Sequence, residues 1–361
     1  MEAKKNDLME RIQRLRTVAI FSELEEEQLE DLSFLAAPCA FPAQHQLFAQ
    51  GECSDGMYLI EEGEVLISVR MPGDDLIEVA RAGPGDLVGE MGLLDRCARS
   101  AKAETQTPIR GLFFSQRRFE MLRSDLRPAA FRILQPLLVE LCRRIRKSHQ
   151  ELLNLPYPPG KQSAEQRRWR TGDFQPVQKT LAGWPPELCE AGTTVPPAAQ
   201  AALPFFQNLA HVDRTRLLEQ GTLVSLPRNT ELQRPDLSGQ DAYLVIRGAV
   251  TETIDVGGAS ETLRVHGPGA LVGIPSAISN EPPLSALTVR EHASLLQLDA
   301  SLAKRWMQGG SVEASRFMEY AASALVTSLR SATAFMSRTA VQEANVERKR
   351  TQTGIMAAIE I

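Results

Sequence analysis

Short runs in which apolar and polar residues alternate fill two stretches of the chain and are separated by Gly and Pro. The first stretch contains LFAQGE, MYLIEEGEVLISVR and LIEVARAGPG. A period of two places the apolar side chains on one face of an extended segment, which is the pattern of a half-buried β-strand. Many short strands with turn residues between them predict a sandwich or a barrel, so we expect a mainly β fold.

Helical spacing flanks each set of predicted strands. Ser22 precedes an acidic turn at residues 23–27, as the N-terminus of a helix prefers. After the first set of strands, apolar residues recur at steps of three and four and predict a long helix with one apolar face; they are Phe131, Leu134, Leu137, Leu138, Leu141 and Ile145. After the second set, another long helix, rich in Ala and Ser, is predicted from Ser311 to Val341.

The chain contains an internal repeat with an offset of 185 residues (206 − 21 = 185) and no gap over its first part. The pairs are Phe21/Phe206, Leu24/Leu209, Leu32/Leu217, Pro42/Pro227, Leu47/Leu232, Tyr58/Tyr243, Gly63/Gly248 and Val65/Val250. The offset falls to 184 (268 − 84 = 184) at Pro84/Pro268, Gly85/Gly269, Val88/Val272 and Gly89/Gly273. A period of this length indicates a duplicated domain and not a solenoid.

Together these patterns divide the chain into segments. The linker between the copies contains LPYPPG, WPPE and VPPA, which is typical of extended or irregular chain. Its two tryptophans, Trp169 and Trp184, predict that it docks onto one of the domains. The expected segments are an amphipathic helix at 1–17, a first domain at 18–150, the Pro-rich linker at 151–203, a second domain at 204–345 and a C-terminal tail at 346–361.

The N-terminal helix has its apolar residues at Leu8, Ile12 and Leu15, between basic flanks. We expect it to pack on the first domain or to bind a partner or a second copy of the chain.

Residues 85–101, GDLVGEMGLLDRCARSA, carry the clearest chemical pattern. Gly89 is followed by the carboxylate of Glu90, a short apolar turn and Arg99. The N–H groups of a tight helical turn can face a phosphate, and an arginine fork can bind two phosphate oxygens. Glu90 would be repelled by a phosphate and suits a donor such as a sugar hydroxyl. The pattern predicts a site for a small anion that carries a ribose; the alternative is a surface ion pair between Glu90 and Arg99.

This order resembles the phosphate-binding cassette of the cyclic nucleotide-binding domain family, in which Gly-Glu precedes Arg-Ser-Ala or Arg-Ala-Ala. The resemblance covers about residues 15–150. Besides the cassette it is carried by residues 18–35, by MYLIEEGEV at 57–65 and by RAGPG at 81–85. It implies two tandem jelly-roll (double-stranded β-helix) barrels, each with N-terminal helices and a long C-terminal helix. It also implies that the helix at about 128–147 closes over the base as a lid.

The resemblance also implies roles for single residues. Glu90 would hold the ribose 2′-hydroxyl and Arg99 the cyclic phosphate, while Ser100 would lie at the phosphate or at the base edge. The ligand implied is cAMP, with cGMP second and cyclic di-GMP third. The candidate ligand-binding residues are Val88, Gly89, Glu90, Met91, Gly92, Leu93, Arg99, Ser100 and Ala101.

The second copy lacks this chemistry. Its matching segment is GALVGIPSAISNEPPLSALT, with Ile274 in place of Glu90 and either Pro283 or Leu284 in place of Arg99. Prolines remove backbone donors, and an anion buried there would have no partner. We expect a domain that binds no cyclic nucleotide and makes contacts instead; a different ligand is the alternative.

Composition narrows the remaining possibilities. The 361 residues carry a formal net charge of −5, which disfavours a chain built mainly to bind nucleic acid. The five cysteines and five histidines are scattered, so we expect free thiols, a cytoplasmic location and no metal site. No apolar run is long enough to span a membrane, and residues 1–17 lack the apolar core of a signal peptide.

The function expected is that of a cytoplasmic cyclic nucleotide sensor, favouring cAMP, which signals through ligand-dependent contact with an unidentified protein. No catalytic constellation, nucleotide-binding loop or DNA-reading module is apparent, so the chain is not expected to be an enzyme. The alternatives are a scaffold with two non-sensing barrels and a transcription regulator without its DNA-reading module. A homodimer through the long helices is also possible on this pattern.

Overall fold

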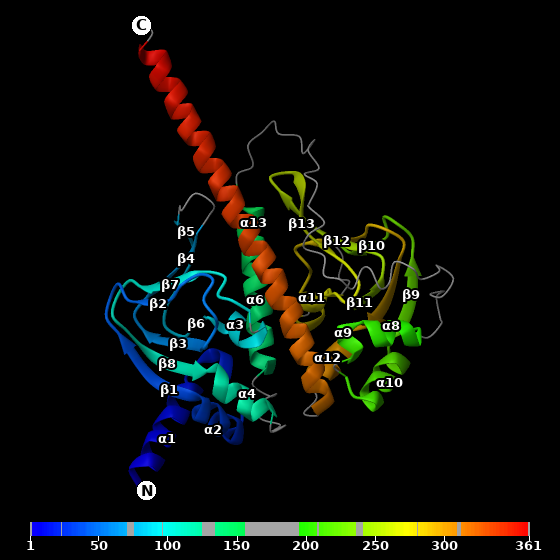
Figure 1. The fold of residues 1–361 in the computed structure, drawn as a ribbon, viewed down its shortest axis with the longest axis horizontal. Helices are drawn as coiled ribbons and strands as arrows, with labels where there is room; N and C mark the ends of the chain where they lie inside the picture. Colours follow the sequence, from blue (N-terminus) through cyan, green and yellow to red (C-terminus); the bar gives the residue numbers. More distant parts are fainter. Residues whose placement is uncertain are drawn as a thin grey trace. The chain divides into compact units, whose positions relative to one another are not determined.

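The structure is a computed structural model that describes residues 2–22, 24–70, 76–95, 97–124, 134–155, 195–207, 209–235, 241–279, 281–308 and 312–359. The chain divides into two compact units (Figure 1). The first unit comprises Met1–Ala19, Ser33–Glu120 and Arg330–Ile361. The second comprises Ile20–Leu32 and Met121–Leu329. Most of the predicted linker, including Trp169 and Trp184, lies outside the described residues.

Eight short strands form two four-stranded antiparallel sheets in the first copy. One sheet has the order β1-β8-β3-β6 and the other β2-β7-β4-β5, which is the strand order of a jelly roll. The strands are β1 (Ala36–Phe41), β2 (Gln46–Phe48), β3 (Gly56–Glu62), β4 (Val65–Arg70), β5 (Leu76–Ala82), β6 (Leu87–Val88), β7 (Lys102–Thr105) and β8 (Ile109–Ser115).

The second copy repeats this arrangement strand for strand. Its sheets have the orders β9-β16-β11-β14 and β10-β15-β12-β13. The strands are β9 (Thr222–Leu226), β10 (Glu231–Gln233), β11 (Ala242–Arg247), β12 (Val250–Val256), β13 (Ala259–His266), β14 (Leu271–Val272), β15 (Ala286–Val289) and β16 (Ala293–Leu298). The two tandem jelly rolls are confirmed, although within the described part of each copy the two sheets are not hydrogen-bonded into one closed barrel.

The core of each copy lies between its two sheets. In the first copy Tyr58 and Ile60 of one sheet pack with Phe48 and Val65 of the other, and the equivalent cluster of the second copy contains Val245 and Val250. Burying each such large apolar side chain contributes roughly 1.5–3 kcal/mol to folding. The alternation predicted from the sequence therefore corresponds to inward and outward faces of facing sheets.

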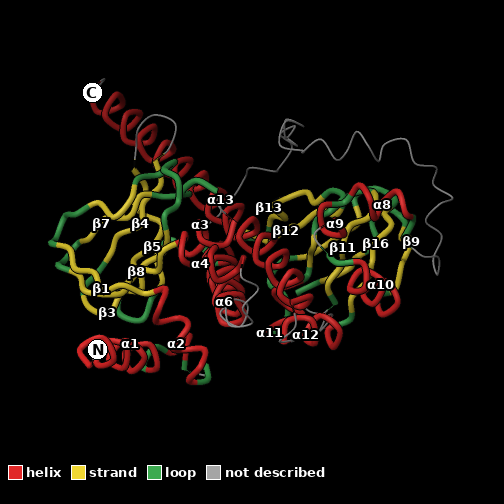
Figure 2. Tube along the Cα trace, turned by 60° about the horizontal axis from the view of Figure 1, so that its bottom comes forward, coloured by secondary structure: helices red, strands yellow, loops and turns green. Residues whose placement is uncertain are grey.

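Helices flank the strands of both copies (Figure 2). Those preceding or interrupting the first jelly roll are α1 (Glu2–Arg16), a 3-10 turn (Ala19–Phe21), α2 (Glu26–Leu35) and α3 (Glu90–Asp95), and α4 (Gln116–Ser124) follows its last strand. The rest are α6 (Leu134–Leu153), α8 (Pro197–Ala202), α9 (Pro204–Gln207), α10 (His211–Gln220), α11 (Ile274–Ser279), α12 (Ala300–Gln308) and α13 (Val312–Ile359).

The N-terminal helix α1 packs on the first copy, as one of the two sequence-based alternatives proposed. Ile12 and Leu15 are buried. Arg11 donates to the carbonyl oxygens of Ser33 and Ala36, and Arg14 forms an ion pair with Glu61 of β3. The helix is thereby fixed to the sheet that contains β1 and β3.

The last helix is longer than the sequence pattern predicted. α13 ends at Ile359 and not near Val341, so it includes residues expected to form a tail. The physical reason is composition: residues 342–353 contain no Pro or Gly and are rich in Gln, Glu, Lys and Arg, which favour helix without needing an apolar face. In the part of the chain that the structure describes, no helix is long and apolar enough to cross a membrane.

Candidate functional site

The cassette of the first copy is a strand, a glycine turn and one short helix. β6 ends at Val88, Gly89 follows with φ +87°, and α3 begins at Glu90. A Cβ atom on Gly89 would lie 2.4 Å from Arg99 Nη1, so a side chain at this position would collide with the guanidinium. Glycine is thus required both by the left-handed backbone and by the close approach of Arg99.

Arg99 is almost completely buried, with 4% of its surface exposed. Its Nη1 donates to the Gly89 carbonyl at 2.9 Å, and its Nη2 donates to the Gly56 carbonyl and to Asp55 Oδ1, both at 2.7 Å. The guanidinium carbon lies 4.1 Å from the centre of the Phe48 ring, which is a cation–π contact. A buried arginine held on several sides is not the surface ion pair that was the alternative interpretation.

Two buried donors at this site have no hydrogen-bond partner among the described residues, Arg99 Nε and Ser54 Oγ. The side chains of both residues approach Gly92: a Cβ atom there would lie 2.5 Å from Ser54 Oγ and 3.4 Å from Arg99 Nη1. Buried polar groups are normally satisfied. Orphaned donors beside a guanidinium are what an anion-binding site needs before its anion is present.

The other predicted residues surround this point. Val88, Glu90, Gly92, Leu93 and Ala101 are buried, and Met91 and Ser100 are half-buried. Glu90 is the first residue of α3 and is 3% exposed. The structure therefore brings Gly89, Gly92 and Arg99 into direct proximity and places Glu90 beside Gly89 in the chain.

Sequence reasoning missed three side chains at this site. Asp55 and Ser54 lie in the loop before β3, and Phe48 ends β2. Nothing in the spacing of these residues sets them apart from ordinary loop and strand positions, because Asp55 and Phe48 contact Arg99, which lies 44 or more positions further along the chain, and Ser54 approaches Gly92.

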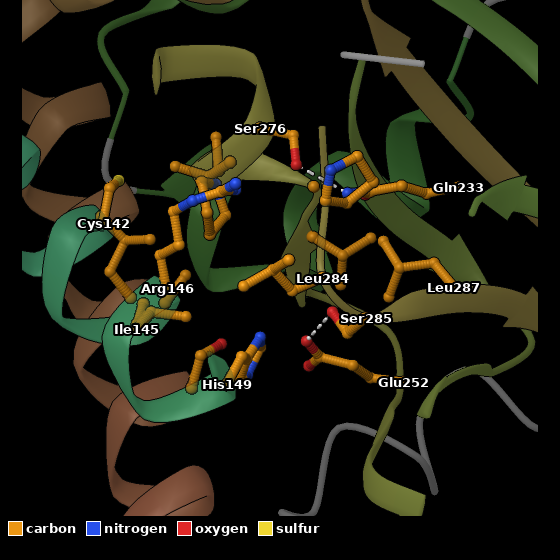
Figure 3. Close-up of a pocket in the computed structure, with 18 of the residues that line it drawn as sticks. Cys142, Ile145, Arg146, His149, Gln233, Glu252, Ser276, Leu284, Ser285 and Leu287 are labelled. Atoms are coloured by element: carbon orange, nitrogen blue, oxygen red, sulfur yellow. Dashed lines mark hydrogen bonds between the residues drawn. The ribbon is translucent and has the colours of Figure 1, made fainter. Parts of the chain in front are cut away.

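The corresponding region of the second copy forms a small, partly open pocket of about 50 Å³ (Figure 3). A volume of this size exceeds the roughly 10–15 Å³ that one buried water needs. Strand alignment of β7 with β15 places Pro283 at the position of Arg99, which resolves the choice left open by the sequence.

Polarity is inverted between the two copies. The cassette residues Glu90 and Arg99 become the non-ionisable Ile274 and Pro283. The wall residues change in the opposite direction: Phe48, Ile67, Ala82 and Ala101 of the first copy correspond in the strand alignment to Gln233, Glu252, His266 and Ser285 of the second.

These wall residues form a buried network. Glu252 Oε2 lies 3.1 Å from His266 Nε2, and the Ser285 hydroxyl donates to Glu252 Oε1 at 2.8 Å. Burial alone would raise the pKa of Glu252, but the hydrogen bond and charge of His266, with smaller effects of His149 and Ser285, lower it to about 2. The pocket therefore presents a buried carboxylate, which would repel a phosphate.

Helix α6 covers this pocket of the second copy. Cys142, Ile145, Arg146 and His149 line it from α6, as their labelled side chains show in Figure 3. Burial lowers the pKa of His149. The sequence led us to expect this helix as the lid of the first copy; here its apolar stripe packs against α11 and β12.

Comparison with known proteins agrees with the geometry of the first copy. Residues 38–125 match the family model of the cyclic nucleotide-binding domain. These residues belong to that family. The matched segment includes the whole cassette, from Val88 to Ala101, together with Phe48 and Asp55.

Two kinds of curated protein are similar to part of this chain. A CRP-like cAMP-activated global transcriptional regulator of Mycobacterium tuberculosis is 32% identical over 143 residues, which are 39% of this chain and 61% of that protein. The cAMP-dependent protein kinase type II regulatory subunit of Drosophila melanogaster is 31% identical over 110 residues, 30% of this chain and 29% of that protein. The chain thus spans about three-fifths of the mycobacterial relative.

Solved structures with cyclic nucleotide-binding domains are also similar to this chain. The regulatory domain of Toxoplasma gondii PKA, solved with cAMP, is 16% identical, with 95% of this chain and 98% of that one covered and a TM-score of 0.30. A cyclic nucleotide-binding domain from Methylobacillus flagellatus is 24% identical, with 42% and 85% covered and a TM-score of 0.38.

Proposed function

We propose that this protein is a cyclic nucleotide sensor whose first copy binds the ligand through Arg99. The observation that carries the proposal is the buried Arg99 guanidinium, with its Nε and the neighbouring Ser54 hydroxyl unpartnered in the described residues. A phosphodiester would supply acceptors for both donors. The ligand class is that of the family to which residues 38–125 belong.

Asp55 occupies part of the place that a phosphate would take. Its carboxylate accepts from Arg99 Nη2 at 2.7 Å, while its side chain is 70% exposed. A side chain with that freedom can leave Arg99 at low cost, so a bound phosphate would replace the Asp55 carboxylate and add a contact to Nε. Charge-assisted hydrogen bonds of this type contribute roughly 1.5–3 kcal/mol each. Glu90, which repels phosphate, would accept from a ribose hydroxyl.

The second copy is proposed to bind no cyclic nucleotide. Pro283 supplies neither a guanidinium nor a backbone N–H at the position of Arg99. The Glu252 carboxylate is ionised and buried in the wall of its pocket. An anion there would meet a like charge with no fixed cation at the cassette position, which costs several kcal/mol. One ligand per chain follows.

The remaining parts of the proposal concern ligand and output. We favour cAMP over cGMP, because the mycobacterial relative is a cAMP-activated regulator and the Drosophila relative a subunit of the cAMP-dependent protein kinase. Four cysteines, Cys39, Cys53, Cys97 and Cys142, are free thiols, which supports a reducing compartment such as the cytoplasm.

The output proposed is contact with another protein, and a pull-down with and without nucleotide is its direct test.

Equilibrium dialysis with labelled cAMP tests the role of Arg99. Replacing Arg99 by Ala should reduce affinity more than tenfold, and Arg99→Lys should also reduce it because a lysine cannot reproduce the fork. Arg110→Ala is the matched control, since that side chain is 74% exposed on β8 and lies 4.0 Å from its acidic neighbour. Circular dichroism reports whether each variant is folded. Unchanged affinity in a folded Arg99 variant contradicts the proposal and leaves the scaffold alternative.

A further inference from the structure

The last helix of the second copy makes a defined contact with the cassette of the first. Arg330 of α13 donates through Nε to Asp95 Oδ2 at 3.0 Å, and its Nη2 lies 2.9 Å from the same oxygen. Nη2 also donates to the Ala98 carbonyl at 3.2 Å. The Asp95 side chain is only 9% exposed, so this is a largely buried ion pair and not a solvated surface pair. All three residues belong to the first unit.

The long helix of the first copy makes the corresponding contact with the second cassette. Arg146 of α6 donates through Nη1 to the Pro282 carbonyl at 2.7 Å, and its Nε lies 2.6 Å from Glu281 Oε2. These residues belong to the second unit. Each cassette loop is therefore held by an arginine from the helix that follows the other copy.

The two contacts are equivalent in the repeat. Arg146 and Arg330 are 184 positions apart (330 − 146 = 184), as are Ala98 and Pro282 (282 − 98 = 184), the offset at which the two cassettes align. The buried faces of the helices follow the same offset, and the buried residues of α13 up to Leu329 belong, like α6, to the second unit. Buried residues of α6 at Leu134, Leu137, Leu138, Leu141, Cys142, Ile145 and Ser148 correspond to buried Met318, Ala321, Ala322, Leu325, Val326, Leu329 and Ala332 of α13.

We propose that the two copies exchange helix contacts, α6 holding the second cassette through Arg146 and α13 the first through Arg330, and that Arg330 is a positioning residue for Arg99. The part of α13 that ends at Leu329 stays with the second unit. The exchange rests on the contacts alone. Its consequence for ligand affinity rests also on the proposed function of the first copy.

The loop between α3 and Arg99 explains how Arg330 would act. Asp95 Oδ1 accepts from the Cys97 N–H at 2.9 Å, while Oδ2 accepts from Arg330. Ala98, whose carbonyl accepts from Arg330, directly precedes Arg99. Arg330 thus ties down both ends of the turn that delivers the Arg99 side chain to Gly89. Without it, the turn loses two of its holding contacts and Arg99 samples more positions.

Cleavage of the connection between the copies tests the exchange without any nucleotide. A specific protease site is inserted in the full chain between residues 156 and 194, and the cut protein is run on size exclusion at micromolar concentration. Because α6 stays with the second copy, the two fragments should elute together at the volume of the intact chain. Separate elution of two folded fragments would overturn the exchange.

Hydrogen exchange of the ligand-free protein tests the positioning role. In Arg330→Ala, amide exchange in the peptide spanning residues 94–99 should accelerate at least fivefold, and Arg330→Lys should restore part of the protection. Arg338→Ala is the matched control, because that arginine donates to Ala334 within α13. Equal exchange in the parent and in Arg330→Ala would overturn the role of Arg330.

Affinity for cAMP separates this inference from the proposed function. Arg330→Ala should weaken binding threefold to tenfold, Asp95→Ala should weaken it similarly, and the double variant should be no worse than either single one. Additive losses would overturn the coupling of these two residues. If the parent binds no cyclic nucleotide but the exchange and cleavage results hold, the proposed function fails while the helix exchange stands.

Discussion

The buried pair Glu252–His266 allows a test of the second pocket, because the first copy shows what the fold accepts without it. Ile67 and Ala82 occupy the equivalent positions. We therefore compare His266→Ala alone with the double change Glu252→Ile and His266→Ala, which restores the pair of residues found in the first copy.

The magnitude follows from the pKa of Glu252, which lies at about 2 where 4.5 is usual. A difference of about 2.5 pKa units corresponds to about 3 kcal/mol favouring the ionised carboxylate in the folded state. Removing His266, the largest favourable influence, leaves that charge buried without its partner and should cost on the order of 3 kcal/mol. Removing both groups should cost less than about 1 kcal/mol, since apolar replacement of a buried pair is often neutral.

Urea unfolding followed by the fluorescence of Trp306 provides the assay. Trp306 is buried in the second unit, and replacing Trp169 and Trp184 by Phe leaves it as the sole tryptophan. The reasoning is refuted if the single variant is as stable as the parent, or if the double variant is less stable than the single one.

Three further predictions concern other parts of the molecule. Gly89→Ala should abolish detectable cAMP binding in dialysis, because its Cβ would lie 2.4 Å from Arg99 Nη1 on a backbone with φ +87°; unchanged binding would argue against this packing. The pKa values of Glu252 and His149 are both lowered in the folded state, so their stabilising contributions are present above about pH 4.5 and 6.5 and are lost as the pH falls. The melting temperature should therefore drop steadily from pH 7 to pH 3, and a flat profile would contradict it. Burial raises the pKa of the Cys142 thiol to about 12, so little thiolate is present to react at pH 7.5. Mass spectrometry should find Cys142 unlabelled by maleimide until urea is added. Rapid labelling of the native protein would show instead that α6 leaves the pocket.

Much of the fold could be predicted because its determinants are local. Alternating residues and Gly or Pro turns indicate the strands, and the repeat from Phe21/Phe206 onward indicates two copies. The end of α13 could not be predicted from an apolar stripe, because its final turns are polar. Which cassette each long helix contacts could not be predicted either. It depends on contacts between residues far apart in the sequence, such as Arg146 with Pro282, which no local spacing encodes.

The site was predicted unevenly for the same reason. Gly89, Glu90 and Arg99 are close enough in sequence to form a motif. Phe48 and Asp55 reach Arg99 only through the fold. In the second copy the sequence indicated the loss of Glu90 to Ile274 and of Arg99 to either Pro283 or Leu284, whereas the polar wall depends on which strands face the pocket.

The central claim is that one guanidinium in the first copy binds one cyclic phosphate. Isothermal titration of the nucleotide-stripped chain with cAMP tests it most directly. The account predicts saturable heat with a stoichiometry of one per chain in the parent and no measurable heat in a folded Arg99→Ala variant. Absence of heat with both cAMP and cGMP, or two ligands per chain, would contradict it.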